Sequence, residues 1–187
     1  MKVRRVTTGH DAAGKAIVVG DSMVDGVAPM LLPGAEFHRL WGADRPPQFP
    51  DAGSQPEGPS YFPPLGGFRF MMFTVAPLSP SQRAAIDRHA LAADMEAKLP
   101  GLAEYIEPHS PGMHTTDTID FEYIIAGEVW LELDEGTMVH LRAGDTVVQN
   151  GTRHAWRNRG SEPCQIVVFM VGVPRKPSGI EVARNSR

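Results

Sequence analysis

The sequence predicts an all-β fold built from antiparallel strands. From Thr118 onward, apolar and polar residues alternate with a period of two, and short connections separate one strand-like segment from the next. No segment with helical periodicity lies between these strands, whereas a parallel sheet needs a long crossover, usually a helix, between neighbouring strands. An antiparallel sandwich or a closed barrel is therefore favoured over a parallel α/β sheet.

The chain has 187 residues and 42% apolar content, which suits one well-buried core and is short for two. We expect one structural domain made of three parts. Residues 1–110 contribute strands, a proline-rich loop and a helix; residues 111–175 form the barrel core; and residues 176–187 form a C-terminal tail.

Composition excludes several classes of partner. A formal net charge of −4 and a pI near 6.0 provide no basic surface for a phosphate backbone, so we expect no nucleic acid partner. No window approaches membrane-spanning length, so we expect no membrane contact. The basic residues at the N-terminus are followed by polar Thr7 and Thr8 rather than an apolar stretch, and the single cysteine, Cys164, lies in an apolar run. A cytoplasmic protein with one buried thiol is expected.

The N-terminal third carries four strand-like pieces, separated by clusters of Gly, Pro and Asp that favour turns. They are residues 3–8, 15–19, 36–41 and 68–75. Between the last two lies loop 43–64, in which repeated prolines remove the backbone donors that a strand ladder needs. We expect an extended loop here.

One helix is predicted over residues 81–99, capped by Ser79 or Ser81. Leu91, Met95 and Leu99 recur four residues apart, and Pro100-Gly101 provides a stop. His89 has no partner at metal-ligand spacing and is interpreted as a surface or packing histidine. The helix is expected either outside the barrel or across its mouth.

The C-terminal half contains six further strand-like segments. They are residues 119–125, 129–134, 138–142, 146–149, 154–158 and 165–171. Asp134-Glu135-Gly136 has the composition of a tight turn and predicts a hairpin between the second and third of these segments.

Two imidazoles and a carboxylate make this half a candidate metal site. His114 and Asp120 lie in the block Gly112–Gly127, and His154 lies in the block Gly144–Asn158. Residues two apart in a strand share a face, so Glu122 would lie beside Asp120. Burying carboxylates beside imidazoles costs several kcal/mol unless a cation or hydrogen bonds compensate. A divalent cation would stabilise such a cluster.

Together the two blocks resemble the two motifs of the cupin family. In that family a glycine stands seven positions beyond the ligand carboxylate, and Gly127 is seven beyond Asp120. The second motif is matched by Gly144, Gly151, His154 and Asn158. The resemblance covers Gly112 to Val171 and implies a jelly-roll β-barrel, N-terminal strand extensions and pairing into a homodimer.

The resemblance also implies a divalent metal ion held by His114, Asp120 and His154, with Fe, Mn, Ni, Co and Zn not distinguished. Three residues depart from the family pattern. Thr116 stands where a second histidine is usual, Asp120 replaces a glutamate, and Asn150 replaces a proline. The first departure removes a ligand, because a hydroxyl binds transition metals poorly.

Other residues receive provisional roles around this site. Glu122 is the candidate proton-transfer group, and Thr116, Gln149 and Trp156 are assigned to the substrate pocket. Tyr123 and Trp130 compete with Trp156 for the pocket wall. Two alternatives remain open: Trp156 packs in the core, and Gln149 bonds to a nearby turn.

The leading functional hypothesis is a metal-dependent enzyme acting on a small organic molecule, by oxygenase, decarboxylase, isomerase or dehydratase chemistry. The alternative is a non-catalytic small-molecule binder that has lost its metal. In it, His114 and Asp120 form a hydrogen-bonded pair. The sequence has no Gly-x-Ser-x-Gly, phosphate-loop, His-Glu-x-x-His or Cys-x-x-Cys motif.

Overall fold

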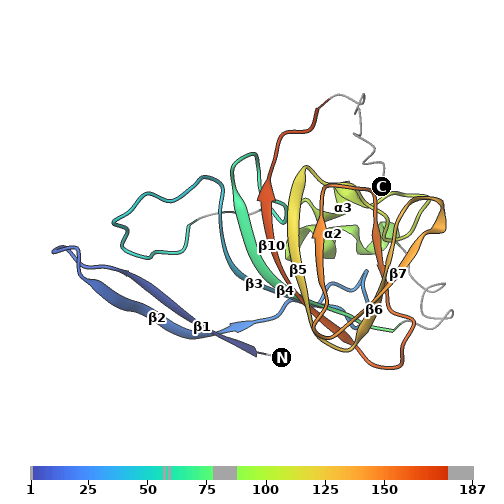
Figure 1. The fold of residues 1–187 in the computed structure, drawn as a ribbon, viewed down its shortest axis with the longest axis horizontal. Coiled ribbons are helices and arrows are strands. Elements are labelled where there is room, and N and C mark those ends of the chain that lie inside the picture. Colours follow the sequence, from blue (N-terminus) through green and yellow to red (C-terminus); the bar gives the residue numbers. More distant parts are fainter. Residues whose placement is uncertain (1, 57, 59, 78–87, 177–187) are drawn as a thin grey trace, which may run out of the picture.

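The computed structural model describes residues 2–56, 58, 60–77 and 88–176 and consists mostly of antiparallel strands (Figure 1). Three sheets are present in this part of the chain, with strand orders β1-β2, β3-β4-β10-β5-β8 and β7-β6-β9. The strands are β1 (Lys2–His10), β2 (Ala16–Asp25), β3 (Glu36–Ala43), β4 (Phe68–Val75), β5 (Thr118–Ala126), β6 (Glu128–Glu132), β7 (Met138–Arg142), β8 (Thr146–Gln149), β9 (Ala155–Arg157) and β10 (Cys164–Gly172).

The five-stranded and three-stranded sheets enclose the hydrophobic core (Figure 1). Ile124 and Ile166 contribute to the core from the larger sheet, while Val129 and Leu131 contribute from the smaller one, and all four are at most 5% exposed. The larger sheet joins two strands of the N-terminal third to three strands of the C-terminal half. The antiparallel all-β prediction is therefore confirmed.

The strand positions agree closely with the sequence prediction, with one exception at the N-terminus. Here β1 and β2 pair only with each other, and β2 continues to Asp25 instead of ending near Val19. Figure 1 shows this hairpin projecting from the body of the molecule. Its apolar side chains remain exposed, which a two-stranded ribbon cannot avoid without a partner surface.

Among the described residues, the α-helices are α2 (Arg88–Lys98) and the short α3 (Leu102–Tyr105), which was not predicted. The predicted helix start at Ser79 or Ser81 lies outside the described residues. Met95 and Leu99 are fully buried, and Gly101 adopts a left-handed φ of 79°, as the predicted stop requires. Within the described chain, no helix is long and apolar enough to cross a membrane.

The end of the proline-rich loop is fixed to the larger sheet by Arg69, a β4 side chain that is only 2% exposed. Its guanidinium donates to the carbonyl oxygens of Ala43 and Ser60 and to the carboxylate of Asp44. These bonds satisfy a buried charge and hold both ends of the loop. As a result Tyr61, at the end of the loop, is buried against the core.

Two of the glycines in the cupin-like motifs are required by the backbone. Gly151 has φ of 57°, and a β-carbon there would lie 2.7 Å from the Thr116 carbonyl oxygen. Gly127 has φ of 76°, and its β-carbon would lie 2.6 Å from the Pro163 carbonyl oxygen. Only glycine meets both conditions without strain, because the left-handed conformation and the close approach each disfavour a side chain.

Candidate functional site

The inner face of β5 carries a row of buried polar side chains. Thr118, Asp120 and Glu122 alternate with outward residues, and the two carboxyl side chains belong to residues only 4% and 5% exposed. Asp120 Oδ1 and Glu122 Oε2 have no hydrogen-bond partner among the described residues. Buried oxygens of this kind need a proton, a cation or a polar ligand.

Burial makes both carboxyl groups hold protons more tightly. It raises the pKa of Asp120 to about 6, against a smaller opposing effect of the hydrogen bond from Thr118. Burial and the nearby charge of Asp120 together raise the pKa of Glu122 well above its usual value. Glu122 is therefore suited to carry a proton at neutral pH.

His114 and His154 form a pair on adjacent backbone segments. Each backbone N–H donates to the other residue's carbonyl oxygen at 3.0 Å, and the ring centroids are 4.2 Å apart. Nδ1 of each ring lies 2.9 Å from a carbonyl oxygen, that of Gly112 for His114 and that of Thr152 for His154. With Nδ1 donating its proton to a carbonyl, Nε2 is left with a lone pair.

Both imidazoles are neutral at pH 7. Burial lowers the pKa of His114, and burial together with the charge of His114 lowers the pKa of His154 to about 4. Neutral imidazole is the form that binds metals and that accepts a proton. The two rings therefore have the chemistry expected of metal ligands.

The four side chains nevertheless form two pairs rather than one cluster. Among the residues that the structure describes, no three His, Cys, Asp or Glu side chains lie close enough together to hold a metal ion. His114 lies with His154, whereas Asp120 lies with Glu122 and raises its pKa. The donor atoms suit a divalent metal, but this arrangement does not fit the predicted three-ligand site.

The residues assigned to the substrate pocket lie inside the fold and are held by neighbours. Thr116 is 1% exposed and its hydroxyl is 2.8 Å from that of Thr118. Gln149 donates from Nε2 to the carbonyl and hydroxyl oxygens of Thr152, as the turn-bonding alternative expects. Trp156 belongs to the core and lies edge-on to His154, with the ring centroids 6.1 Å apart.

Two candidates for the pocket wall were wrong. Tyr123 is 46% exposed because it alternates with Glu122 and points away from the core. Trp130 alternates with buried Val129 in the same way, and its ring stacks on His140 with a centroid distance of 4.1 Å. Both aromatic side chains lie on outer faces, where strand alternation places them.

Sequence reasoning missed Tyr61, which comes from the proline-rich loop and is 7% exposed. Burial and the charges of Asp120 and Glu122 raise the pKa of its phenol, while Arg39 opposes this rise. Tyr61 is thus within electrostatic range of the carboxyl pair and of the Arg39 guanidinium. The available signal was the adjacent aromatic pair Tyr61-Phe62 in a loop whose one other aromatic residue is Phe49.

Residues 103–170 match the model of the cupin domain. This part of the chain is a cupin domain. The domain includes β5 to β9, most of β10, and all seven predicted site residues. Tyr61 and Arg39 lie outside the matched segment.

Curated relatives of this chain come from fungal biosynthesis clusters. Phomopsin biosynthesis cluster protein D of Diaporthe leptostromiformis is 42% identical over 69 residues, which are 37% of this chain and 36% of the relative. Oryzines biosynthesis cluster protein J of Aspergillus oryzae is 40% identical over 65 residues, which are 32% of this chain and 36% of the relative. The chain thus spans about a third of the length of these relatives.

Solved structures similar to the chain include two proteins of low sequence identity. A predicted oxalate decarboxylase from Thermotoga maritima is 15% identical with a TM-score of 0.43, covering 80% of this chain and 94% of that one. A cupin 2 conserved barrel domain protein from Salinispora arenicola is 18% identical with a TM-score of 0.39, covering 73% of this chain and 75% of that one.

Proposed function

We propose that this cupin protein is an enzyme that binds a small organic molecule between its sheets and transfers a proton to or from it. Glu122 is the proton-transfer group, and burial together with the charge of Asp120 raises its proton affinity. The names of the curated relatives refer to biosynthesis clusters, which supports a biosynthetic intermediate as the substrate.

The observation that carries this proposal is the pair of unsatisfied buried oxygens, Asp120 Oδ1 and Glu122 Oε2. A purely structural interior rarely retains such groups, since each costs about 1–3 kcal/mol without a partner. A polar substrate group bound beside β5 supplies the missing hydrogen bonds. Glu122, kept protonated by burial, can then donate its proton to that group.

A divalent metal is the second part of the proposal. His114 and His154 offer two Nε2 lone pairs, and Asp120 is the third ligand that the cupin-like motif predicts. Such a cation would supply Lewis-acid or redox chemistry, with Fe, Mn, Ni, Co and Zn all compatible with these donors. Asp120 would have to leave Glu122 and approach the imidazoles for this site to form.

The alternative is a small-molecule binder without catalysis. It is favoured by Thr116, which stands in place of the third imidazole and is already satisfied by Thr118. In a binder the same unsatisfied oxygens would hold a ligand that leaves unchanged.

The experiment that tests the enzyme proposal compares wild-type protein with Glu122→Gln and with Glu104→Gln, a surface control on α3. Each protein is incubated with a metabolite extract of the organism from which the sequence comes, and the depletion of small molecules is followed by mass spectrometry. We expect depletion of a small molecule by wild type and Glu104→Gln, and none by Glu122→Gln. Equal depletion by all three overturns the role of Glu122, and a ligand that binds but is never converted supports the binder.

Metal dependence is tested separately by elemental analysis of protein purified without chelator or nickel affinity resin. We expect near-stoichiometric metal in wild type, lost in His114→Ala and His154→Ala and retained in His109→Ala, whose side chain is exposed in a loop. Equal metal in all four proteins would show adventitious binding.

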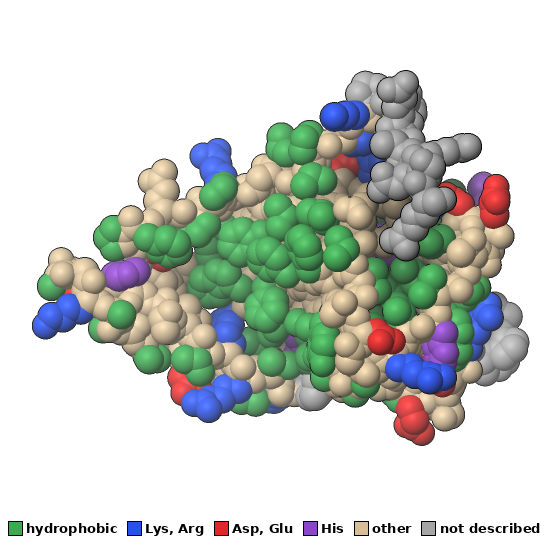
Figure 2. Space-filling model, viewed as in Figure 1, with side chains coloured by type: hydrophobic (Ala, Val, Ile, Leu, Met, Phe, Trp, Pro, Cys, Tyr) green, Lys and Arg blue, Asp and Glu red, His purple; other side chains and the backbone are tan. Residues whose placement is uncertain are grey.

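We further propose that the protein is a homodimer. Trp41, Phe70, Phe169, Phe121 and Val148 lie in one row across the outer face of the five-stranded sheet. Figure 2 shows hydrophobic side chains gathered over this region. The projecting β1–β2 hairpin also exposes Val6 and Val18, at 51% and 65%. In a two-fold pair, each hairpin would cover the other copy's sheet.

A further inference from the structure

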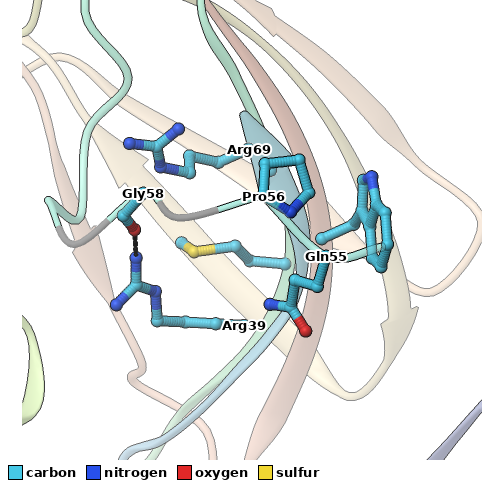
Figure 3. A pocket seen from close by; sticks show the side chains of 8 residues that line it. Arg39, Gln55, Pro56, Gly58 and Arg69 are labelled. Carbon is cyan, nitrogen blue, oxygen red and sulfur yellow. Dashed lines mark hydrogen bonds between the residues drawn. The ribbon is translucent and has the colours of Figure 1, made fainter. Parts of the chain in front are cut away.

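A cavity of about 420 Å³ lies at the β3 edge of the five-stranded sheet, beneath the proline-rich loop (Figure 3). Its size suits a small organic ligand. None of the predicted site residues lines it. The lining residues are Arg39, Trp41, Gly42, Gln55, Pro56, Gly58, Arg69 and Met71.

One of its two arginines, Arg69, has a structural role. Five oxygens accept hydrogen bonds from its guanidinium, including the carboxylate of Asp44 at 2.6 Å. Gly42 leaves room for the side chain, since a β-carbon there would lie 2.7 Å from Arg69 Cδ. The charge of Arg69 is thus balanced by Asp44 and by the loop backbone.

Arg39 is different, because its charge has no carboxylate partner in the described chain. Among the described residues, Nη2 of Arg39 donates to the carbonyl oxygens of Gly58 and Ser60, and neither of these partners is charged. Ser60 also accepts from Arg69, at 3.0 Å, so the two guanidinium groups lie close together. Burial and the charge of Arg69 lower the pKa of Arg39. Within the described residues, Asp44 is thus paired with Arg69 and acts on Arg39 only through its charge.

A third arginine adds to the positive potential at the rim. Arg5 lies over the ring of Trp41, with Cζ 5.6 Å from the ring centroid, and donates to Gln55 Oε1 at 2.8 Å. The chain as a whole carries a net charge of −4, so this concentration of cations is local. A local field of this sign attracts anionic ligands and steers their approach.

We propose that this cavity binds the carboxylate of a small organic acid, with Arg39 as its counter-ion. Carboxylate oxygens would complete the hydrogen bonds of Arg39, while Trp41, Pro56 and Met71 contact the apolar part of the ligand. The inference rests on the proposed function, because Tyr61 is within electrostatic range of both Arg39 and the carboxyl pair and so relates the cavity to that site. The proposed substrate is thus an organic acid that Arg39 holds by one end.

The test uses phenylacetate and its neutral analogue phenylacetamide as probes, titrated calorimetrically at low ionic strength. We expect the acid to bind wild-type protein at least about tenfold more tightly than the amide, since only the acid pairs with Arg39. Arg39→Gln should remove this preference, and Arg142→Gln, on exposed β7, should keep it. Equal affinity of wild type for the two probes, or an unchanged preference in Arg39→Gln, would overturn the proposal.

A second pair of measurements protects the test from misfolding and separates it from the enzyme proposal. The first is a nuclear magnetic resonance measurement on wild type, which does not depend on whether Arg39→Gln folds. Phenylacetate should shift the indole N–H signal of Trp41, and an unshifted signal overturns the site. Glu122→Gln should bind phenylacetate as wild type does. If Glu122→Gln binds phenylacetate but no longer depletes the metabolite, both proposals stand. If it binds phenylacetate and still depletes the metabolite, only the role of Glu122 is overturned.

Discussion

Asp120 and His154 both lie in the interior of the fold, but burial affects their protons in opposite ways. It favours the neutral form of each residue, so it raises the pKa of the carboxyl group to about 6 and lowers that of the imidazole to about 4. The two residues therefore contribute opposite slopes to the dependence of stability on pH between about 4 and 6. Single substitutions can separate the two slopes.

Asp120→Asn should stabilise the fold at alkaline pH. The folded state binds the Asp120 proton more tightly than the unfolded state. Wild type therefore loses stability as the pH rises from 3.8, the ordinary pKa of this carboxyl group, to about 6, its pKa in the folded protein. A shift of this size corresponds to a gain of up to about 3 kcal/mol for Asn at pH 8, and to little difference near pH 3.5. Urea unfolding with a chelator present measures both values. A loss of stability at pH 8 would contradict the burial effect.

His154→Gln should remove a loss of stability in acid. The unfolded state takes up this proton near pH 6.5 and the folded state only near pH 4, so wild type is fully stabilised above 6.5 and loses stability below it. Between pH 7.5 and pH 5, with chelator, the unfolding free energy of wild type should therefore fall further than that of the variant. His109→Gln, in an exposed loop, should follow wild type at both.

At the scale of elements, the connections depend on backbone conformations that side chains disfavour. Gly151→Ala should destabilise the fold more than Gly144→Ala. Both residues have positive φ, but a β-carbon at Gly144 meets open space, whereas one at Gly151 would clash with the Thr116 carbonyl. The conformational cost alone is about 1 kcal/mol, and the clash adds to it. Equal losses in urea unfolding would show that the connection relaxes around the new methyl group.

The strands themselves were largely predictable from sequence, because alternation and turn residues are local signals. The same alternation also placed Glu122 inward and therefore Tyr123 outward, so the assignment of Tyr123 to the pocket was inconsistent with the strand that carried it. The assignment of Trp130 to the pocket was wrong for the same reason. Consistent use of the inward and outward alternation along each strand would have avoided both errors.

The candidate site was only partly predictable. The motif spacing found His114, His154 and the two carboxyl residues, and all four are buried or nearly so. It did not find Arg39 and Tyr61, because they approach the site through the larger sheet's edge strand and through a loop without periodic pattern. Nor did it show that the imidazole and carboxyl pairs stay apart, which depends on side-chain packing.

On the scale of the whole molecule, the apolar row on the outer sheet predicts association. Phe169→Lys should convert the proposed homodimer to a monomer, because it places a charge at the centre of that row, where Phe169 is paired with Phe70 and Phe121. Val139→Lys is the control, since Val139 has similar exposure, 41%, on the smaller sheet. Light scattering after size exclusion measures the mass of each. A monomeric wild type, or a dimeric Phe169→Lys, would contradict the proposed interface.

The carbonyl oxygen of Ser60 receives hydrogen bonds from both Arg39 and Arg69, and the next residue along the chain is Tyr61. One peptide unit therefore joins the cation at the sheet edge to the phenol beside the carboxyl pair. An acid that completes the hydrogen bonds of Arg39 would hold this guanidinium against Ser60, and with it the peptide unit that precedes the phenol. Capture of the acid at the sheet edge would in this way act on the position of Tyr61.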